Sequence, residues 1–273
     1  MSLSVKTQQP SSGEHKVVNM PIIQYDNVCK KFDNSGRLAV DHVSAQIEKG
    51  EFITILGSSG CGKTTLLKLT NRLYDPDEGK VLVDGENIAN VDPVALRRRL
   101  GYVIQQVGLF PHMTIRDNIT VIPQLMKWDK KRMDERADEL LTLVGLAPSE
   151  YRDRYPHQLS GGQQQRVGLA RALVLDPEIL LMDEPFGAID AITRLNLQNE
   201  FMKIQEGLGK TILFVTHDIN EAFKLGSRVM VMNEGKLLQF DTPAEIVKNP
   251  ADSFVRSLIE AARSQEEFWE NVR

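Results

Sequence analysis

The sequence predicts an α/β fold with a mostly parallel sheet, and two observations lead to that prediction. Between residues 163 and 232, expected helices (163–175, 191–205, 219–225) alternate with short apolar runs expected to be strands (179–182, 212–215, 229–232). Apolar strands separated by helices are typical of a parallel sheet covered on both faces. Upstream, an apolar strand at 52–56 runs directly into a Gly/Ser loop and a helix expected at 64–74.

The remaining elements follow from the same patterns. Strands are expected at 22–25, 43–48, 81–83 and 101–104, with turns at 34–36 and 49–50, and 237–240 forms a hairpin with 229–232. The stretch 107–159 shows no convincing strand and contains an amphipathic helix at 130–144, so we expect a helical subdomain at about 107–160. Two short helices are expected over 243–272. The predicted organisation is a disordered tail (1–20), one domain (21–260) and a short helical tail (261–273).

Composition excludes several classes of protein. The chain has 273 residues, 41% of them hydrophobic, and a net charge of -4, which argues against nucleic-acid binding. No run approaches the roughly 20 apolar residues that cross a bilayer, and residues 1–20 lack the apolar core of a signal peptide. Cys29 and Cys61 form no disulfide framework, which indicates a reducing cytosol.

The loop after strand 52–56 fits the phosphate-binding pattern G-x-x-x-x-G-K-[ST]. Glycines let successive N–H groups point at phosphate oxygens, and the following helix directs its positive end there. Lys63 would reach the β and γ phosphates, and the Thr64 hydroxyl would bind Mg²⁺. A chance match is the alternative, but the strand–loop–helix context favours function. The loop residues are Gly57, Ser58, Ser59, Gly60, Cys61, Gly62, Lys63, Thr64 and Thr65.

Two acids end the strand at 179–182. Asp183 at the strand tip would bind Mg²⁺, and Glu184 would reach a water in line with the γ phosphate. The carboxyl ends of parallel strands are where α/β folds bind ligands. An ordinary solvated Asp-Glu turn is the alternative, and it would be favoured without the phosphate loop upstream.

A second anion site is expected at Ser160, Gly161, Gly162 and Gln163. Ser160 and Gln163 form a capping box, so a plain helix start is the alternative. Two glycines leave the helix N-terminus open to an anion. One nucleotide needs only one such site in a subunit, whereas a dimer whose second site completes the partner's first site needs both.

These features, in this order and spacing, resemble the ATPase subunit of ABC transporters over about residues 22–259. The resemblance implies an ABC-type P-loop nucleotide-binding domain, with an N-terminal antiparallel β part and an inserted helical subdomain, that hydrolyses ATP with Mg²⁺. It also implies the roles of four further residues. Gln105 (or Gln106 beside it) would contact Mg²⁺ and the attacking water, and His217 would contact the γ phosphate. Asp190 matches the D-loop aspartate, although Ile189 stands where the family more often has Leu. Phe32 matches the aromatic residue that stacks on adenine, with a core Phe as the alternative.

The resemblance also implies partners. It predicts a head-to-tail homodimer that closes over two ATP molecules, with Glu184 as the general base. It predicts that residues 109–113, from Leu109 to Met113, contact a membrane permease, with simple core packing as the alternative. A substrate-binding protein would act indirectly, and the chain would lie in the cytoplasm at the inner face of the membrane. Cys61 occupies a position of the loop where any residue can stand, and we interpret it as a tolerated residue; a redox switch is the alternative.

Segments 69–74, 102–112, 151–156 and 160–166 resemble the quaternary-amine uptake branch, which imports glycine betaine, carnitine, choline or proline. That branch commonly continues into a paired regulatory (CBS) domain, where this sequence has only 261–273. The alternatives are an importer of an amino acid or an anion, an ABC ATPase without a transport role, and a P-loop kinase. A kinase would lack the motif that this sequence has at residues 159–163.

Overall fold

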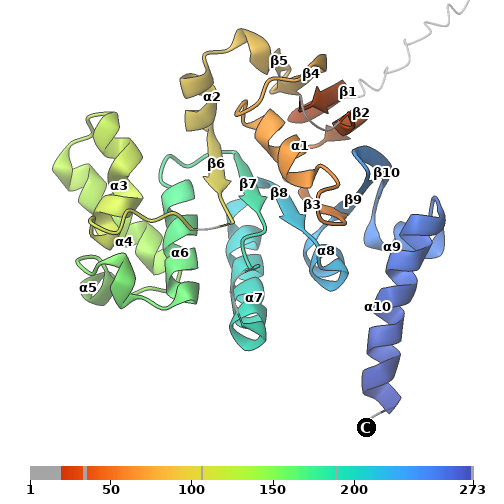
Figure 1. The fold of residues 1–273 in the computed structure, drawn as a ribbon. Helices are drawn as coiled ribbons and strands as arrows, with labels where there is room; N and C mark the ends of the chain where they lie inside the picture. The colour runs from red at the N-terminus through yellow and green to blue at the C-terminus, as the bar shows by residue number, and fades with distance from the viewer. Residues whose placement is uncertain (1–19, 33–35, 106, 188–189, 272–273) are drawn as a thin grey trace, which may run out of the picture.

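The computed structural model describes residues 20–32, 36–105, 107–187 and 190–271. Within these ranges the strands form two sheets (Figure 1). The antiparallel sheet has the order β2-β1-β4-β5, with β1 (Ile23–Lys31), β2 (Leu38–Ile47), β4 (Glu78–Val83) and β5 (Glu86–Asn87). The larger sheet has the order β10-β9-β3-β8-β7-β6, with β3 (Phe52–Gly57), β6 (Leu100–Val103), β7 (Ile179–Asp183), β8 (Thr211–Thr216), β9 (Arg228–Asn233) and β10 (Lys236–Asp241). Its strands are parallel except for β10, so the predicted fold class is confirmed.

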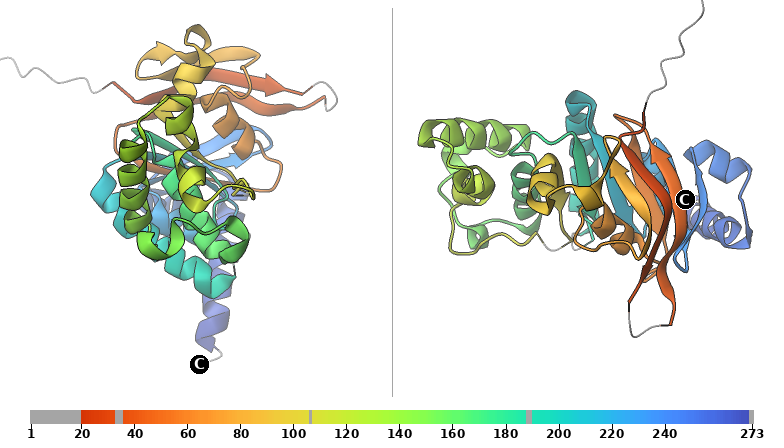
Figure 2. Two further views of the ribbon diagram at one scale, coloured as in Figure 1. Left: turned by 90° about the vertical axis from the view of Figure 1, so that its left-hand side faces the viewer. Right: turned by 90° about the horizontal axis from the view of Figure 1, so that it is seen from above.

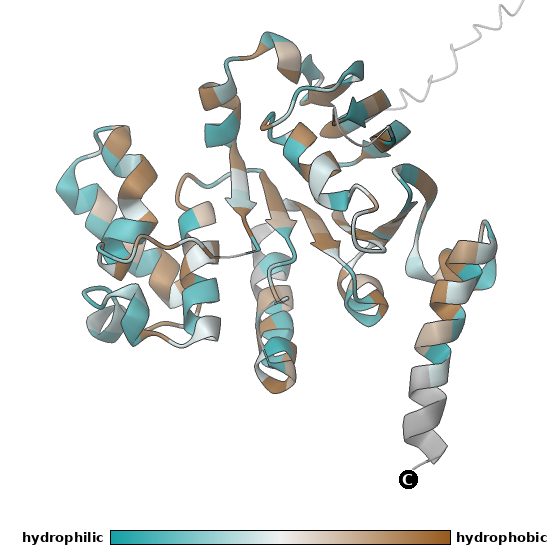
Figure 3. Cartoon of the chain, in the orientation of Figure 1, coloured by the Kyte–Doolittle hydropathy of each residue, from teal (hydrophilic) through white to brown (hydrophobic). Residues whose placement is uncertain are grey.

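The larger sheet is buried on both faces. Successive side chains of a strand point to opposite faces, so Leu181 and Leu213 belong to one core and their neighbours Leu180 and Phe214 to the other. Helix α1 (Lys63–Thr70) packs in the first core, between the two sheets, through Leu66, Leu67 and Leu69. Figure 3 shows the apolar residues gathered on these strands, whereas the surrounding helices carry both apolar and hydrophilic residues.

Helix α1 is shorter than expected. It ends at Thr70 instead of reaching residue 74, because Arg72 adopts a left-handed conformation (φ 48°) and the Leu73 N–H turns back to the Lys68 carbonyl at 2.9 Å. Leu73, expected on the buried face, is therefore 44% exposed.

The second core lies under a group of helices to one side of the sheet (Figures 1 and 2). These are α3 (Ile115–Leu125), α4 (Lys130–Leu143), α5 (Pro148–Tyr151) and α6 (Gly161–Ala172), with the 3-10 turn η2 (Pro156–Gln158). The described part of 107–159 contains no strand, as expected. The sequence analysis did not predict α3 or α2 (Pro93–Arg99). Both helices begin after a side-chain cap, Thr114 for α3 and Asp92 for α2, and such caps are a sequence signal of a helix start. A further turn, η1 (Ile88–Asn90), follows β5.

The last helices are α7 (Ala191–Leu208), α8 (Ile219–Leu225), α9 (Pro243–Lys248) and α10 (Ser253–Asn271). The expectation of two short C-terminal helices is wrong for the second, which has 19 residues. The first turns of α10 pack in a core cluster through Val255 and Ile259, and the rest of the helix extends away from the two sheets (Figure 1). No helix among the described residues combines the length and apolarity needed to cross a membrane. The predicted tail, 1–20, and the turn at 34–36 fall largely outside the described residues, and the domain boundaries remain predictions.

Candidate nucleotide-binding site

The phosphate-binding loop joins β3 to α1 in a conformation that requires glycine. All six residues of β3 are buried, which anchors the start of the loop. Gly62, at the N-cap of α1, has φ 106°, and a Cβ there would lie 2.0 Å from the Ala39 carbonyl oxygen. A Cβ on Gly57 would lie 2.1 Å from the Met232 carbonyl oxygen. No side chain fits at such distances, so the backbone of this loop is set by its contacts with β2 and β9.

Lys63 is buried inside the curve of the loop, with 4% of its surface exposed. Its ammonium donates hydrogen bonds to the carbonyls of Gly57 (2.8 Å) and Ser58 (3.0 Å). Both carbonyls are neutral, so the positive charge stays available at the N-terminus of α1, which also favours an anion. The loop and this lysine together can bind a phosphate group.

Thr64 and Asp183 bring two oxygen ligands together beside that lysine. The Thr64 hydroxyl donates to Asp183 Oδ1 at 2.8 Å. Burial raises the pKa of Asp183 above its ordinary value, and the Thr64 hydrogen bond and nearby Lys68 oppose that rise. A bound cation would replace the missing solvation of this carboxylate. Hydroxyl and carboxylate oxygens are the ligands that Mg²⁺ prefers, so the residues present fit this ion.

Three side chains meet at the next point along the sheet edge. Gln105 Nε2 donates to Glu184 Oε2 at 3.2 Å, and His217 Nδ1 lies 3.3 Å from the same oxygen. These residues follow β6, β7 and β8, which are neighbours in the sheet, so the parallel arrangement brings their carboxyl ends to one edge. Glu184 has φ 43°, an uncommon conformation for a residue with a side chain, and its N–H bonds the Val215 carbonyl at 3.1 Å. The backbone thus directs this carboxylate toward Gln105 and His217.

Glu221 was not singled out from the sequence, and it lies just behind this group. It is 7% exposed, accepts a 2.8 Å hydrogen bond from Gln198 and has a pKa raised by burial. A cavity of about 10 Å³ lies among Glu221, Glu184 and His217. Asp218, three residues before Glu221, caps α8, so the sequence pattern is that of an ordinary acidic first helical turn and carries no sign of the burial.

Residues 160–163 start α6 as a capping box. Ser160 Oγ accepts from the Gln163 N–H (3.3 Å), and Gln163 Oε1 accepts from the Ser160 N–H (2.9 Å). A Cβ on Gly161 would meet open space, whereas Gly162 packs closely on Thr193 of α7. Helices α6 and α1 pack in different cores on the two faces of the sheet. One chain therefore does not bring the two predicted anion sites together.

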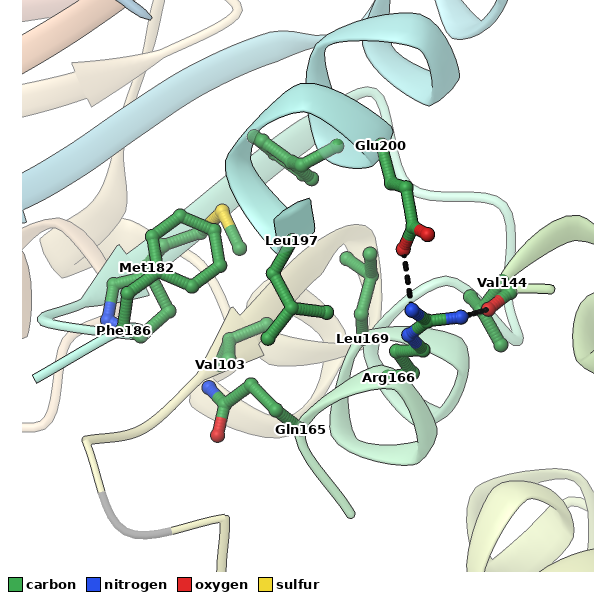
Figure 4. Close-up of a pocket in the computed structure, with 11 residues that line it drawn as sticks. Val103, Val144, Gln165, Arg166, Leu169, Met182, Phe186, Leu197 and Glu200 are labelled. Atoms are coloured by element: carbon green, nitrogen blue, oxygen red, sulfur yellow. Dashed lines mark hydrogen bonds and ion pairs between the residues drawn. The ribbon is translucent and has the colours of Figure 1, made fainter. Parts of the chain in front are cut away.

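Helix α6 is tied to α7 by an ion pair that Figure 4 shows. Arg166 lies 2.6 Å from Glu200 and donates to the Val144 carbonyl at 3.3 Å. Beside it, Gln165 and Leu197 line a cavity of about 30 Å³. Asp190 caps the start of α7 by accepting from the Thr193 N–H at 3.0 Å. The Arg166–Glu200 ion pair therefore links the helix that begins after Ser160 to the helix that begins after Asp190, and both of these residues were predicted to contact the nucleotide.

Other predicted residues lie at the margins of the site. Phe32 is 39% exposed and contacts Tyr74 edge to face at 5.2 Å, so the core alternative is wrong. The Ser58 hydroxyl donates a hydrogen bond to Asn233 Oδ1 at 3.3 Å. Cys61 is 3% exposed, and burial raises the pKa of its thiol, which disfavours the reactive thiolate. Gln106 and Ile189 lie outside the described residues.

A groove opens beside residues 109–113, which are not simple core. Phe110 is 41% exposed and lines a cavity of about 570 Å³ together with Val94 of α2 and Leu125 of α3. The fully buried Asn118 shapes this stretch, since it accepts from the Phe110 N–H (2.7 Å) and donates to the carbonyls of Phe110, Met113 and Thr114. The sequence analysis predicted a contact surface at residues 109–113, which include Phe110, but not the walls that α2 and α3 contribute to the groove.

Comparison with known proteins now decides the family, because residues 40–187 match the ABC transporter family. The chain belongs to the ABC transporter family. It is 56% identical over 238 residues to the choline transport ATP-binding protein OpuBA of Bacillus subtilis, and 54% identical to the glycine betaine/carnitine/choline transport ATP-binding protein OpuCA of the same organism. These matches cover 87% of this chain and 62% of each relative, so the chain spans about three fifths of their length.

Among solved structures, the ATP-binding cassette MJ0796, a dimer in a post-hydrolysis state bound to ADP and Pi, superposes with a TM-score of 0.71. It is 35% identical, and the match covers 81% of this ABC family member and 98% of the cassette. Family membership implies that the chain binds ATP.

Proposed function

We propose that this chain is the ATP-hydrolysing subunit of an ABC importer that drives uptake of a quaternary-amine osmoprotectant. The observation that carries the proposal is the convergence of Gln105, Glu184 and His217 at the sheet edge that also presents Lys63 and the Thr64–Asp183 pair. A phosphate site, a cation site and a carboxylate base, placed in this order, suit in-line attack of water on a terminal phosphate.

The chain's own residues would divide the reaction as follows. Lys63 and the loop N–H groups bind the phosphates, and Thr64 and Asp183 hold Mg²⁺, which supplies charge neutralisation when bound. Glu184 accepts a proton from the attacking water or orients that water. Gln105 and His217 hold the Glu184 carboxylate and lie where they can contact the water and the γ phosphate.

The complete site would need two chains. The open N-terminus of α6 lies in a different layer from the phosphate loop of the same chain, so Ser160–Gln163 of one copy would close on the loop of another. A head-to-tail homodimer with two ATP molecules satisfies this requirement for both copies. The dimeric state of the MJ0796 cassette supports the arrangement.

The groove at Phe110 is the proposed contact with a membrane permease, which would place the chain at the cytoplasmic face of the membrane. An exposed apolar groove of this kind is typical of a partner contact. It is lined by Arg171, whose guanidinium bonds the Gly108 carbonyl at 2.9 Å, so the groove borders the segment that follows Gln105. Opening of the ATP site could therefore be passed to the partner through Gln105. The cargo-binding protein would act only through the permease.

The substrate class rests on the two quoted relatives, whose names cite choline, glycine betaine and carnitine. The test is reconstitution of the chain with its permease and solute-binding protein in proteoliposomes. ATP-dependent uptake of labelled choline or glycine betaine is expected. Uptake of a polar amino acid or an anion in their place would overturn the substrate class, and ATP hydrolysis that needs no Glu184 would overturn the catalytic assignment.

A further inference from the structure

A group of potential metal ligands lies in the antiparallel sheet. Cys29 of β1, His42 of β2 and Glu78 of β4 each offer one ligand atom, and these three atoms lie within 4.8 Å of one another. Cys29 pairs with Glu78 across the β1–β4 ladder, and His42 lies opposite Cys29 at a register shift between β1 and β2. Neighbouring strands therefore bring the three side chains to one place.

The backbone is arranged around the Cys29 sulfur. The His42 N–H donates to Cys29 Sγ at 3.3 Å, so the residue that offers the imidazole is also bound to the sulfur through its backbone. His42 has φ 50°, and the bulge at this point redirects its side chain relative to a regular strand. Cys29 is 2% exposed, whereas His42 and Glu78 are exposed, so a cation could enter from the His42 and Glu78 side.

The histidine is held by a neighbouring carboxylate. His42 Nδ1 lies 2.6 Å from Asp41 Oδ1, and since a carboxylate can only accept, the ring nitrogen is the donor. A ring nitrogen that donates to a carboxylate leaves Nε2 with a free lone pair, and histidines that bind metals are commonly held in this way.

We propose that Cys29, His42 and Glu78 form a binding site for a zinc-type divalent cation, with Asp41 as the residue that orients His42. A thiolate and an imidazole select Zn²⁺ over Mg²⁺, which prefers oxygen ligands only. Tetrahedral Zn²⁺ needs its ligand atoms about 3.3–3.7 Å apart, and the present atoms lie within 4.8 Å, so the exposed Glu78 side chain would rotate toward the other two ligands on binding. The thiol proton leaves to solvent on binding, and water occupies the fourth position.

Occupancy would fasten β2, β1 and β4 together three residues before Phe32. The site is separate from the Thr64–Asp183 pair and does not depend on the proposed transport function. Bound metal should raise the midpoint of thermal unfolding, because a ligand that binds only the folded state stabilises it.

The test uses the full chain without a histidine tag and with Co²⁺ as the probe, in the absence of nucleotide. One Co²⁺ per chain is expected, with the near-ultraviolet band of a cobalt–thiolate bond, and Zn²⁺ but not Mg²⁺ should displace it. Cys29→Ser should abolish the band. Cys61→Ser, which changes the other cysteine, should keep it.

Three further variants test the remaining residues. His42→Ala and Glu78→Gln should each weaken binding at least tenfold, and Asp41→Asn should weaken it about tenfold. His157→Ala, at an exposed histidine on η2, should leave affinity unchanged. A band that survives Cys29→Ser overturns the proposal. Equal affinity of Glu78→Gln and the unmodified chain also overturns it, and this conservative exposed substitution decides the matter if Cys29→Ser does not fold.

Discussion

Glu184→Gln separates catalysis from folding better than any other change at this site. The substitution keeps the shape of the side chain and removes its ability to take a proton. Both contacts of Glu184 converge on one oxygen, so the amide atom that replaces it can keep one of them: as oxygen it accepts from Gln105 (3.2 Å), and as nitrogen it donates to His217 (3.3 Å). The left-handed backbone at φ 43° is no harder for Gln than for Glu.

The expected magnitudes therefore differ widely. Loss of a general base lowers kcat by about 10²–10⁴, or about 3–5 kcal/mol in activation free energy. The free energy of unfolding should change by less than about 1 kcal/mol, because at most one contact of a partly exposed side chain is lost. ATP binding should persist, and the bound state should accumulate as a dimer.

The assay is phosphate release at saturating ATP and Mg²⁺, with dimer formation followed by size-exclusion chromatography and light scattering. Glu178→Gln is the matched control. It makes the same chemical change at the other end of β7, where Glu178 lies 3.1 Å from Lys49 in an exposed pair worth at most about 1 kcal/mol. Hydrolysis by Glu184→Gln within about threefold of the Glu178→Gln rate would refute the assignment of Glu184 as the base.

Three further predictions concern the phosphate loop, the start of α6 and the buried Glu221. Gly62→Ala should lower the free energy of unfolding by roughly 3 kcal/mol in urea titrations, because a Cβ there would lie 2.0 Å from the Ala39 carbonyl oxygen; an unchanged midpoint would contradict the loop geometry. Ser160→Arg should leave ATP binding intact and block hydrolysis, and a normal phosphate-release rate would disprove the two-chain site. Glu221 has a pKa raised above 4.5 by burial, so the native state binds its proton more tightly than the unfolded state. The free energy of unfolding should therefore fall as pH rises from 4.5 through the raised pKa, and Glu221→Gln should lack this component; parallel pH profiles of the two proteins would count against it.

Local pattern was enough to predict the strands and loops that carry the site. The apolar runs at 52–56, 179–182 and 212–215 have the length and apolarity typical of central strands, so the residues after them are expected at the carboxyl edge of the sheet. Helix ends were predicted less well. Residue 73 continues the apolar spacing of α1, but the chain turns at Arg72, which no spacing pattern indicates.

The sequence by itself determined the phosphate loop and the paired acids, because each depends on residues that are adjacent in the chain, and the order and spacing of these motifs indicated the family. Only the tertiary structure decided which residues from different elements meet. It placed Gln105, Glu184 and His217 at one carboxylate oxygen, buried Glu221 behind them and gathered Cys29, His42 and Glu78 across three strands. Such contacts are set by strand order and register, which follow from how the whole core packs and not from any short segment.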